Sequence, residues 1–281
     1  MKYLLKSLIV MAGFAVLSGA ALAADRPPST CLAVAENIRS PELPNVHFAS
    51  VTLGASLDKY EVAISYQGHS TYLIESAGGE RVATDYAGWM ADPRLPTIVT
   101  MNQAHSSHFT SFPDPKIPNV LRGWNPEGGP ADHQVEIGDV LVRNVTTDIL
   151  RFNLIPDGNS IFIFEVAGLC IGHLGHLHHK LSESQYAKIG RLDVVMVPVD
   201  GGLTLAHSSV NELLERMRSS VVLPMHVRFS GALPGFLSYL GDRFAVKTLR
   251  KNRLVLSLKT LPKQPTVILL PGVSSFPQYD E

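Results

Sequence analysis

Short runs of apolar or alternating residues, bounded by turn residues, begin after Glu61 and predict a chain dominated by β-strands. The first series covers residues 62–66, 71–74, 81–84, 97–101, 135–137, 140–145, 160–166 and 169–171, and a less regular one covers 194–197, 221–224, 253–258 and 266–269. Apolar residues recur at helical spacing in 182–189, 208–218 and 235–240. Two sets of strands with few helices predict an α+β fold, an αββα four-layer sandwich, although other α+β folds would give the same pattern.

The beginning of the chain has a different character. Lys2 and Lys6 precede a short apolar stretch, and Ala21 and Ala23 frame a cleavage site, so residues 1–23 are interpreted as a signal peptide rather than an uncleaved anchor. Residues 24–58, rich in proline and polar residues, are expected to form an extended N-terminal arm that wraps the domain, with a strand near 47–53. Residues 59–281 form the expected single domain, and the Pro- and Gly-rich stretch 111–132 is its longest predicted loop.

Charge and cysteine content narrow the expected location and partners. The net charge of −1 gives no long-range reason to bind nucleic acid or anionic lipid, so we expect a small-molecule substrate, no nucleic acid and no membrane after signal cleavage. A cleaved signal predicts a periplasmic or secreted protein. There Cys31 and Cys170 could pair, but Cys170 lies in an apolar run, and we favour a free, buried thiol over a disulfide.

The histidines supply the candidate chemistry. Seven of the eleven fall in three places, each after a strand-like run: His105 and His108, then His173, His176, His178 and His179, then His226. Side chains that follow strands can converge on one edge of a sheet, and neutral imidazole is a ligand for Zn, Cu, Fe or Ni. A single histidine is more often a surface or capping residue, but the density of this group favours a metal site.

Several segments in this order resemble the ascorbate-phosphate-lactonase-like branch of the metallo-β-lactamase superfamily. They are Gly68-His69-Ser70-Thr71-Tyr72-Leu73-Ile74, the strand ending at Asp85, the segment from Asn102 to His108, the run from Gly172 to His179, the turn from Val197 to Gly202, and Leu223-Pro224-Met225-His226. The resemblance implies the αββα sandwich and a metal-dependent hydrolase of ester, lactone, amide or phosphodiester bonds.

The resemblance also shows which ligands have changed. The family's His-x-His-x-Asp-His segment falls on Gln103, His105, Ser107 and His108, so two of its four ligands are replaced. The next family histidine, after the strand ending near Val145, has no counterpart here.

Later in the chain, the family's bridging aspartate is replaced by His176, whereas its ligands His173 and His226 are kept. The predicted ligands are His105, His108, His176 and His226, with His173 as a reserve ligand or a supporting residue.

Loss of both carboxylates disfavours two adjacent divalent ions, whose four positive charges neutral imidazole cannot offset. We therefore expect one divalent ion, with zinc the first choice, that activates water for hydrolysis. Asp200 or His178 would help to orient that water or accept its proton, although Asp200 could equally form a turn. His69 and Asp85 are expected to support the site by hydrogen bonds. The alternative is a non-catalytic periplasmic binding or metal-holding protein that retains the fold.

Overall fold

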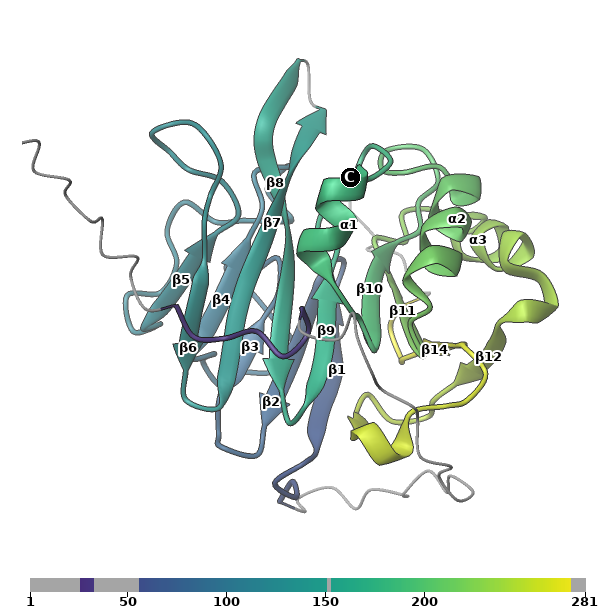
Figure 1. The fold of residues 1–281 in the computed structure, drawn as a ribbon, viewed down its shortest axis with the longest axis horizontal. Coiled ribbons are helices and arrows are strands. Elements are labelled where there is room, and N and C mark those ends of the chain that lie inside the picture. Colours follow the sequence, from purple (N-terminus) through teal and green to yellow (C-terminus); the bar gives the residue numbers. More distant parts are fainter. Residues whose placement is uncertain (1–25, 33–55, 151–152, 274–281) are drawn as a thin grey trace, which may run out of the picture.

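The computed structural model describes residues 26–32, 56–150 and 153–273, and its core is two β-sheets that pack face to face (Figure 1). The expected signal peptide, the strand near 47–53 and most of the arm lie outside these residues. One sheet has six strands in the order β13-β1-β2-β3-β4-β5. Their bounds are β1 (Val62–Gly68), β2 (Thr71–Ser76), β3 (Arg81–Ala83), β4 (Ile98–Met101), β5 (Asn119–Arg122) and β13 (Leu254–Leu256).

The second sheet has eight strands in the order β12-β14-β11-β10-β9-β8-β7-β6. Strands β6 to β9 form an antiparallel meander, and β9, β10, β11, β14 and β12 run parallel. Their bounds are β6 (Gln134–Ile137), β7 (Val140–Leu150), β8 (Leu154–Val166), β9 (Leu169–His173), β10 (Val194–Pro198), β11 (Val221–Met225), β12 (Ala245–Thr248) and β14 (Thr266–Leu269).

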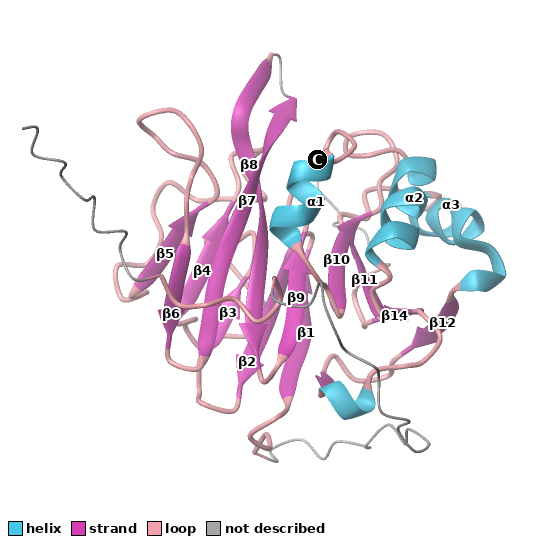
Figure 2. Cartoon of the chain, viewed as in Figure 1, coloured by secondary structure: helices cyan, strands magenta, loops and turns pink. Residues whose placement is uncertain are grey.

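Three α-helices lie beside the eight-stranded sheet (Figure 2). They are α1 (Glu183–Ile189), α2 (His207–Met217) and α3 (Ala232–Leu240), and two short 3₁₀ turns follow at Gly241–Arg243 and Leu258–Thr260. Helix α1 begins where Ser182 and Gln185 form a capping box, which satisfies backbone groups that a helix start leaves open. None of the described helices is long and apolar enough to cross a membrane.

One apolar core joins both sheets and the helices. Tyr72 of β2 is fully buried in it, and its hydroxyl donates to the carbonyl of Pro224 in β11 at 2.7 Å, which ties the first sheet to the second. The predicted α+β sandwich is therefore confirmed.

Four strands differ from the prediction. Strand β5 lies within the segment 111–132, which was expected to be a loop. It was not predicted because its partly exposed residues form no apolar run. Strand β12, with alternating exposed positions, was not expected either. Strands β7 and β8 extend to Leu150 and from Leu154, well beyond their apolar segments, because polar residues occupy the outer part of this hairpin.

The described part of the arm, residues 26–32, lies against the second sheet. Glu165 of β8 accepts hydrogen bonds from the backbone of Thr30 and Cys31 and pairs with Arg143 of β7. Cys31 forms a disulfide with Cys170, so the expectation of a free thiol is wrong. The apolar run around Cys170 correctly indicated burial, but burial does not distinguish a thiol from a disulfide whose partner arrives from a distant segment.

Candidate metal centre

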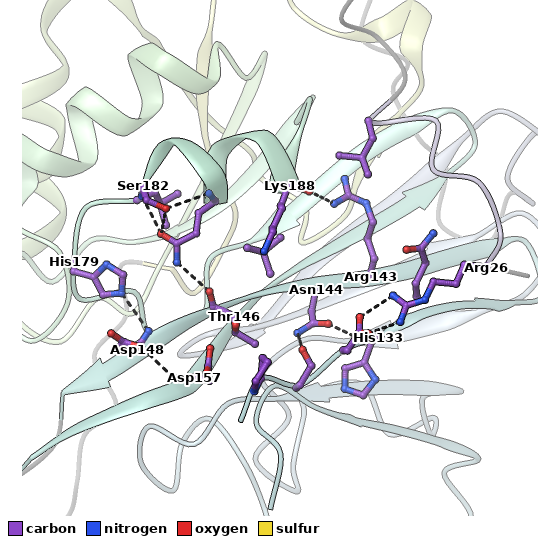
Figure 3. A pocket seen from close by; sticks show the side chains of 18 of the residues that line it. Arg26, His133, Arg143, Asn144, Thr146, Asp148, Asp157, His179, Ser182 and Lys188 are labelled. Carbon is purple, nitrogen blue, oxygen red and sulfur yellow. Dashed lines mark hydrogen bonds and ion pairs between the residues drawn. The ribbon is translucent and has the colours of Figure 1, made fainter. Parts of the chain in front are cut away.

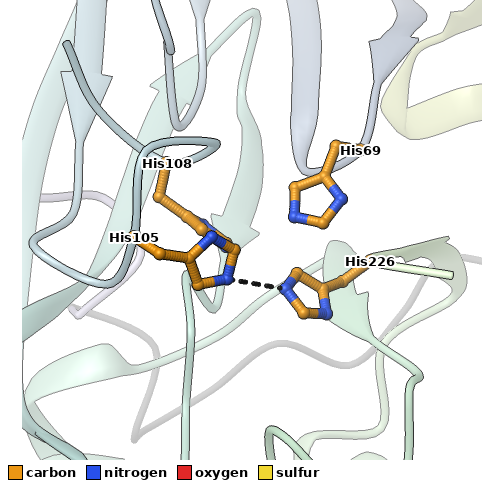
Figure 4. Close-up of side chains that lie close together, drawn as sticks. All are labelled: His69, His105, His108 and His226. Carbon is orange, nitrogen blue, oxygen red and sulfur yellow. Dashed lines mark hydrogen bonds between the residues drawn. The ribbon is translucent and has the colours of Figure 1, made fainter. Parts of the chain in front are cut away.

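The histidine cluster forms where loops from both sheets meet. His69 lies in the turn between β1 and β2, His105 and His108 follow β4, and His226 follows β11 (Figure 4). The backbone amide of His226 donates to the carbonyl of His69 at 2.9 Å, so the two sheets are joined directly at the site. The convergence expected from strand ends is present, although His69 was expected to act only as a supporting residue.

Four imidazoles lie close enough together to surround one metal ion. One ligand nitrogen from each of His69, His105, His108 and His226 lies within 4.8 Å of the others. Nε2 of His105 and Nε2 of His226 are 3.5 Å apart, close to the separation of about 3.3 Å that tetrahedral Zn–N bonds of 2.0–2.1 Å require. The widest separation in the group, up to 4.8 Å, exceeds the tetrahedral value by as much as about 1.5 Å, so the loops that carry the histidines must close around the ion.

Two buried carboxylates orient two of these rings. Nδ1 of His108 lies 2.6 Å from Oδ2 of Asp85, and Nδ1 of His226 lies 2.6 Å from Oδ2 of Asp200. In each pair the imidazole donates its Nδ1 proton, which leaves the Nε2 lone pair directed into the cluster. Asp85 thus has the supporting role that the sequence suggested, and Asp200 contacts a candidate ligand rather than the centre of the cluster.

The local electrostatics keep two of these histidines neutral. Burial, and then the neighbouring imidazoles, lower the pKa of His69 to about 2, and the same causes lower the pKa of His108. Burial opposes ionisation of Asp200, but hydrogen bonds from His226 and from the backbone of Gly202 hold the pKa of Asp200 below its ordinary value. Burial raises the pKa of Asp85. Neutral imidazole is the form that binds a metal ion.

The backbone around the cluster is strained. His69, Asp85 and His226 have φ angles of 49°, 42° and 59°, in the left-handed region that non-glycine residues rarely adopt. Such conformations cost of order 1–3 kcal/mol each and persist where the surrounding structure enforces them, commonly at functional sites. Here they turn two imidazoles and one supporting carboxylate toward the same point.

The other predicted residues take different positions. His176, which we placed among the ligands, has ring contacts with His105, His108 and His226 but is not in the four-nitrogen group. Its Nε2 is buried without a hydrogen-bond partner, and its Nδ1 lies 2.9 Å from Nε2 of His178. Both nitrogens of His173 are engaged, Nε2 with the carbonyl of Ser70 and Nδ1 with the amide of Gly175, which leaves His173 a supporting residue in this structure.

Positions at which the family's ligands are replaced do not rebuild a second metal site. Ser107 donates or accepts a hydrogen bond at Nδ1 of His105, 2.8 Å away. Gln103 lines a separate cavity with Trp124, and Thr147 bonds Asn159. No carboxylate belongs to the candidate metal group among the residues that the structure describes.

A pocket of about 290 Å³ opens beside the cluster. Its lining consists of Ala104, His105, Ile149, Leu150, His176, His178, Leu203 and Arg228. A larger cavity of about 840 Å³ lies elsewhere, between β7 and α1 (Figure 3). Asn144 and Thr146 of β7 are among its lining residues. Because the four clustered histidines do not line it, we place the chemistry at the smaller pocket.

The donor set fits a metal ion. Nε2 of His69 and Nε2 of His108 are buried and have no hydrogen-bond partner, and leaving such nitrogens unmatched costs about 1–3 kcal/mol each. A divalent ion bound by these lone pairs would satisfy them, and imidazole donors are suited to zinc.

Comparison with known proteins gives the family context. Residues 63–226 match the beta-lactamase superfamily domain. A candidate Zn-dependent hydrolase of the metallo-β-lactamase superfamily from Thermotoga maritima is 24% identical, with a TM-score of 0.53 over 74% of this chain and 98% of that one. A candidate metal-dependent hydrolase from Parabacteroides distasonis is 11% identical, with a TM-score of 0.53 over 75% of this chain and 93% of that one. No curated protein sequence matches the chain.

Proposed function

Because the chain belongs to the beta-lactamase superfamily, we propose that it is an exported hydrolase that holds one divalent metal ion, preferably zinc, among four imidazoles. The observation that carries the proposal is the group of four nitrogen donors within 4.8 Å, with no carboxylate among them. Four neutral ligands can hold one dication, but they cannot offset the charge of two adjacent ones. Export is supported by the disulfide, which persists in oxidising compartments, and by the signal-like residues 1–23.

The chain's own residues prepare the site for hydrolysis. A bound divalent ion supplies Lewis acidity and lowers the pKa of water toward about 7. Asp85 and Asp200 hold the rings of His108 and His226, so these two rings need little reorientation when the ion enters. His178 lines the pocket and contacts His176, which places an exchangeable proton beside the substrate space.

Asp200 has a positioning role in this proposal. Its Oδ1 accepts from the amides of Gly202, Leu203 and Thr204, and its Oδ2 accepts from Thr204 and His226. With both oxygens engaged, Asp200 is not free to accept a proton from water. His178 therefore remains the better candidate for proton transfer.

The test measures metal content and turnover in the same preparations. Untagged protein, depleted of metal and then incubated with zinc, is expected to retain one equivalent and to hydrolyse a member of an ester, lactone, amide and phosphodiester panel. His226→Ala should lose both properties. His133→Ala is the matched control, because His133 contacts the carbonyl of Arg122 away from the cluster.

Three outcomes decide between the functions. Wild-type protein that stays empty after incubation with Zn, Mn, Fe or Cu would contradict the metalloenzyme. Two retained equivalents would contradict the single-ion centre. One equivalent without turnover across the panel would favour the metal-holding protein, for which the loss of family ligands is the supporting observation.

A further inference from the structure

The pocket beside the cluster is lined by two kinds of side chain. His105, His176 and His178 are polar, and Ile149, Leu150 and Leu203 are apolar. Its volume of about 290 Å³ is at the small end of ligand pockets, which span about 300–1,000 Å³. A ligand that fills it must therefore be small and partly apolar.

Part of the apolar lining is exposed at the protein surface. Leu150 is 55% exposed, Leu203 is 53% exposed, and Leu154, directly across the hairpin from Leu150, is 59% exposed. Directly opposed residues on paired strands share one face of the sheet. Single exposed leucines are ordinary, but Leu150 and Leu203 line the pocket and Leu154 is paired with Leu150, so apolar surface adjoins the pocket.

Charge selects the polar end of the ligand. Arg228, which is exposed, lines the pocket two residues after His226, and no Asp or Glu is among the lining residues. The described ion pairs do not include Arg228, so its guanidinium is available to a ligand.

The larger cavity of Figure 3 has no comparable set of groups for binding an anionic ligand. Three of the four Arg and Lys side chains in its lining already have partners: Arg26 pairs with Asp132, and Lys180 pairs with Glu212. Arg143 pairs with Glu165 and donates to two backbone carbonyls of α1.

Resting on the proposed hydrolase function, we propose that the substrate is a small amphiphilic anion, an ester or lactone with a short aliphatic chain and a carboxylate or phosphate group. The aliphatic chain of the substrate lies along Leu150 and Leu203, and its anionic group pairs with Arg228. Water adds its oxygen to the acyl carbon, the bond to the alkoxy oxygen breaks, and a proton passes to that oxygen. The products are a carboxylic acid and a hydroxyl group.

Binding of unreactive probes tests this class apart from turnover. Calorimetric titration of zinc-loaded and metal-free protein uses hexanoate, hexyl phosphate, 1-hexanol and hexylammonium. At least one anion should bind more tightly than hexanol, and hexylammonium should bind most weakly. The same order of affinities is expected in metal-free protein, because the contact between the anion and Arg228 does not require the metal ion. The tighter anion identifies the carboxylate or the phosphate as the natural group. Octanoate should bind more tightly than hexanoate, by about fourfold at most for each methylene that becomes buried.

Two variants and two controls assign the contacts. Arg228→Gln should weaken binding of the preferred anion about fivefold and leave the affinity for hexanol unchanged, as expected for a partly exposed ion pair. Leu203→Ser should weaken that anion and hexanol alike. The exposed residues Arg250 and Leu95, which lie outside the pocket, provide the controls Arg250→Gln and Leu95→Ser, which should change neither.

Failure of this inference differs from failure of the proposed function. Equal affinity for hexanoate and hexylammonium, no dependence on chain length, or equal effects of the pocket variants and their controls would overturn the substrate class, even in an active enzyme. Preference for the anion in a protein that binds no metal would overturn the hydrolase and, with it, the assignment of the anion as substrate.

Discussion

Replacing Asp85 by asparagine should weaken metal binding and stability together, for a reason that is specific to this site. Asp85 accepts two hydrogen bonds, from Nδ2 of Asn102 at 2.8 Å and from Nδ1 of His108 at 2.6 Å. An asparagine has only one acceptor oxygen, so its amino group must face one of these two donors. Asn102 cannot turn over freely, because its Oδ1 already accepts from the amide of Ser160 at 2.7 Å.

Both orientations of the new amide are unfavourable. If its amino group faces Asn102, two buried donors oppose each other, at a cost of about 1–3 kcal/mol. If it faces His108, the imidazole must move its proton to Nε2, the atom that would bind the ion. Loss of such a supporting contact typically lowers metal affinity about 10–100-fold, and the stability loss corresponds to a Tm lower by roughly 3–9 °C.

The assay combines zinc titration against a competing chelator with thermal unfolding of the metal-free protein. Asp193→Asn is the matched control, because Asp193 is also buried and accepts from the amide of Cys170 at the opposite end of the sheet strands from the cluster. The control is expected to change stability without changing zinc affinity. A folded Asp85→Asn protein with wild-type zinc affinity would refute the reasoning.

The remaining predictions concern the ligand set, acid sensitivity and the disulfide. His69→Gln should abolish tight zinc binding while His176→Gln retains it, and the reverse result in competitive titrations would restore the ligand set predicted from sequence. Burial lowers the folded-state pKa of His69 and His108 below the unfolded value of about 6.5. Metal-free protein should therefore lose stability as the pH falls below about 6.5, by up to about 1.4 kcal/mol per pH unit for each group. Urea midpoints that stay constant from pH 7 to 5 would contradict this expectation. Reduction of the bond between Cys31 and Cys170, 139 residues apart, should lower the free energy of unfolding by at most about 5 kcal/mol, measured by denaturant titration with and without reductant, and unchanged midpoints would count against a stabilising disulfide.

Much of the fold could be predicted because its central strands are buried on both faces. The apolar runs of β1, β2 and β10 predicted the starts of these strands to the residue and their ends to within two residues. Strand β5 could not be found in this way, because an edge strand with partly exposed residues needs no apolar run. The disulfide was missed because pairing between residues far apart in sequence depends on where the arm docks, which composition does not show.

The site was predictable in location more than in ligand identity. Strand ends correctly indicated that His105, His108 and His226 converge. The inclusion of His69 depends on its left-handed backbone and on the hydrogen bond from His226, neither of which spacing shows. The sequence signals were its place in a glycine-preceded turn between two strands and its place in the first segment that carries the family resemblance, and these predicted only a supporting role.

X-ray absorption spectroscopy of the zinc-loaded protein tests the single-ion centre most directly. The account predicts one zinc per chain, with imidazole scattering, Zn–N distances of about 2.0–2.1 Å and no metal–metal component. A His69→Gln sample should lose part of the imidazole signal, whereas the His133→Ala control should not. A metal–metal distance of about 3.5–4 Å, the spacing of two-metal sites, would contradict the claim.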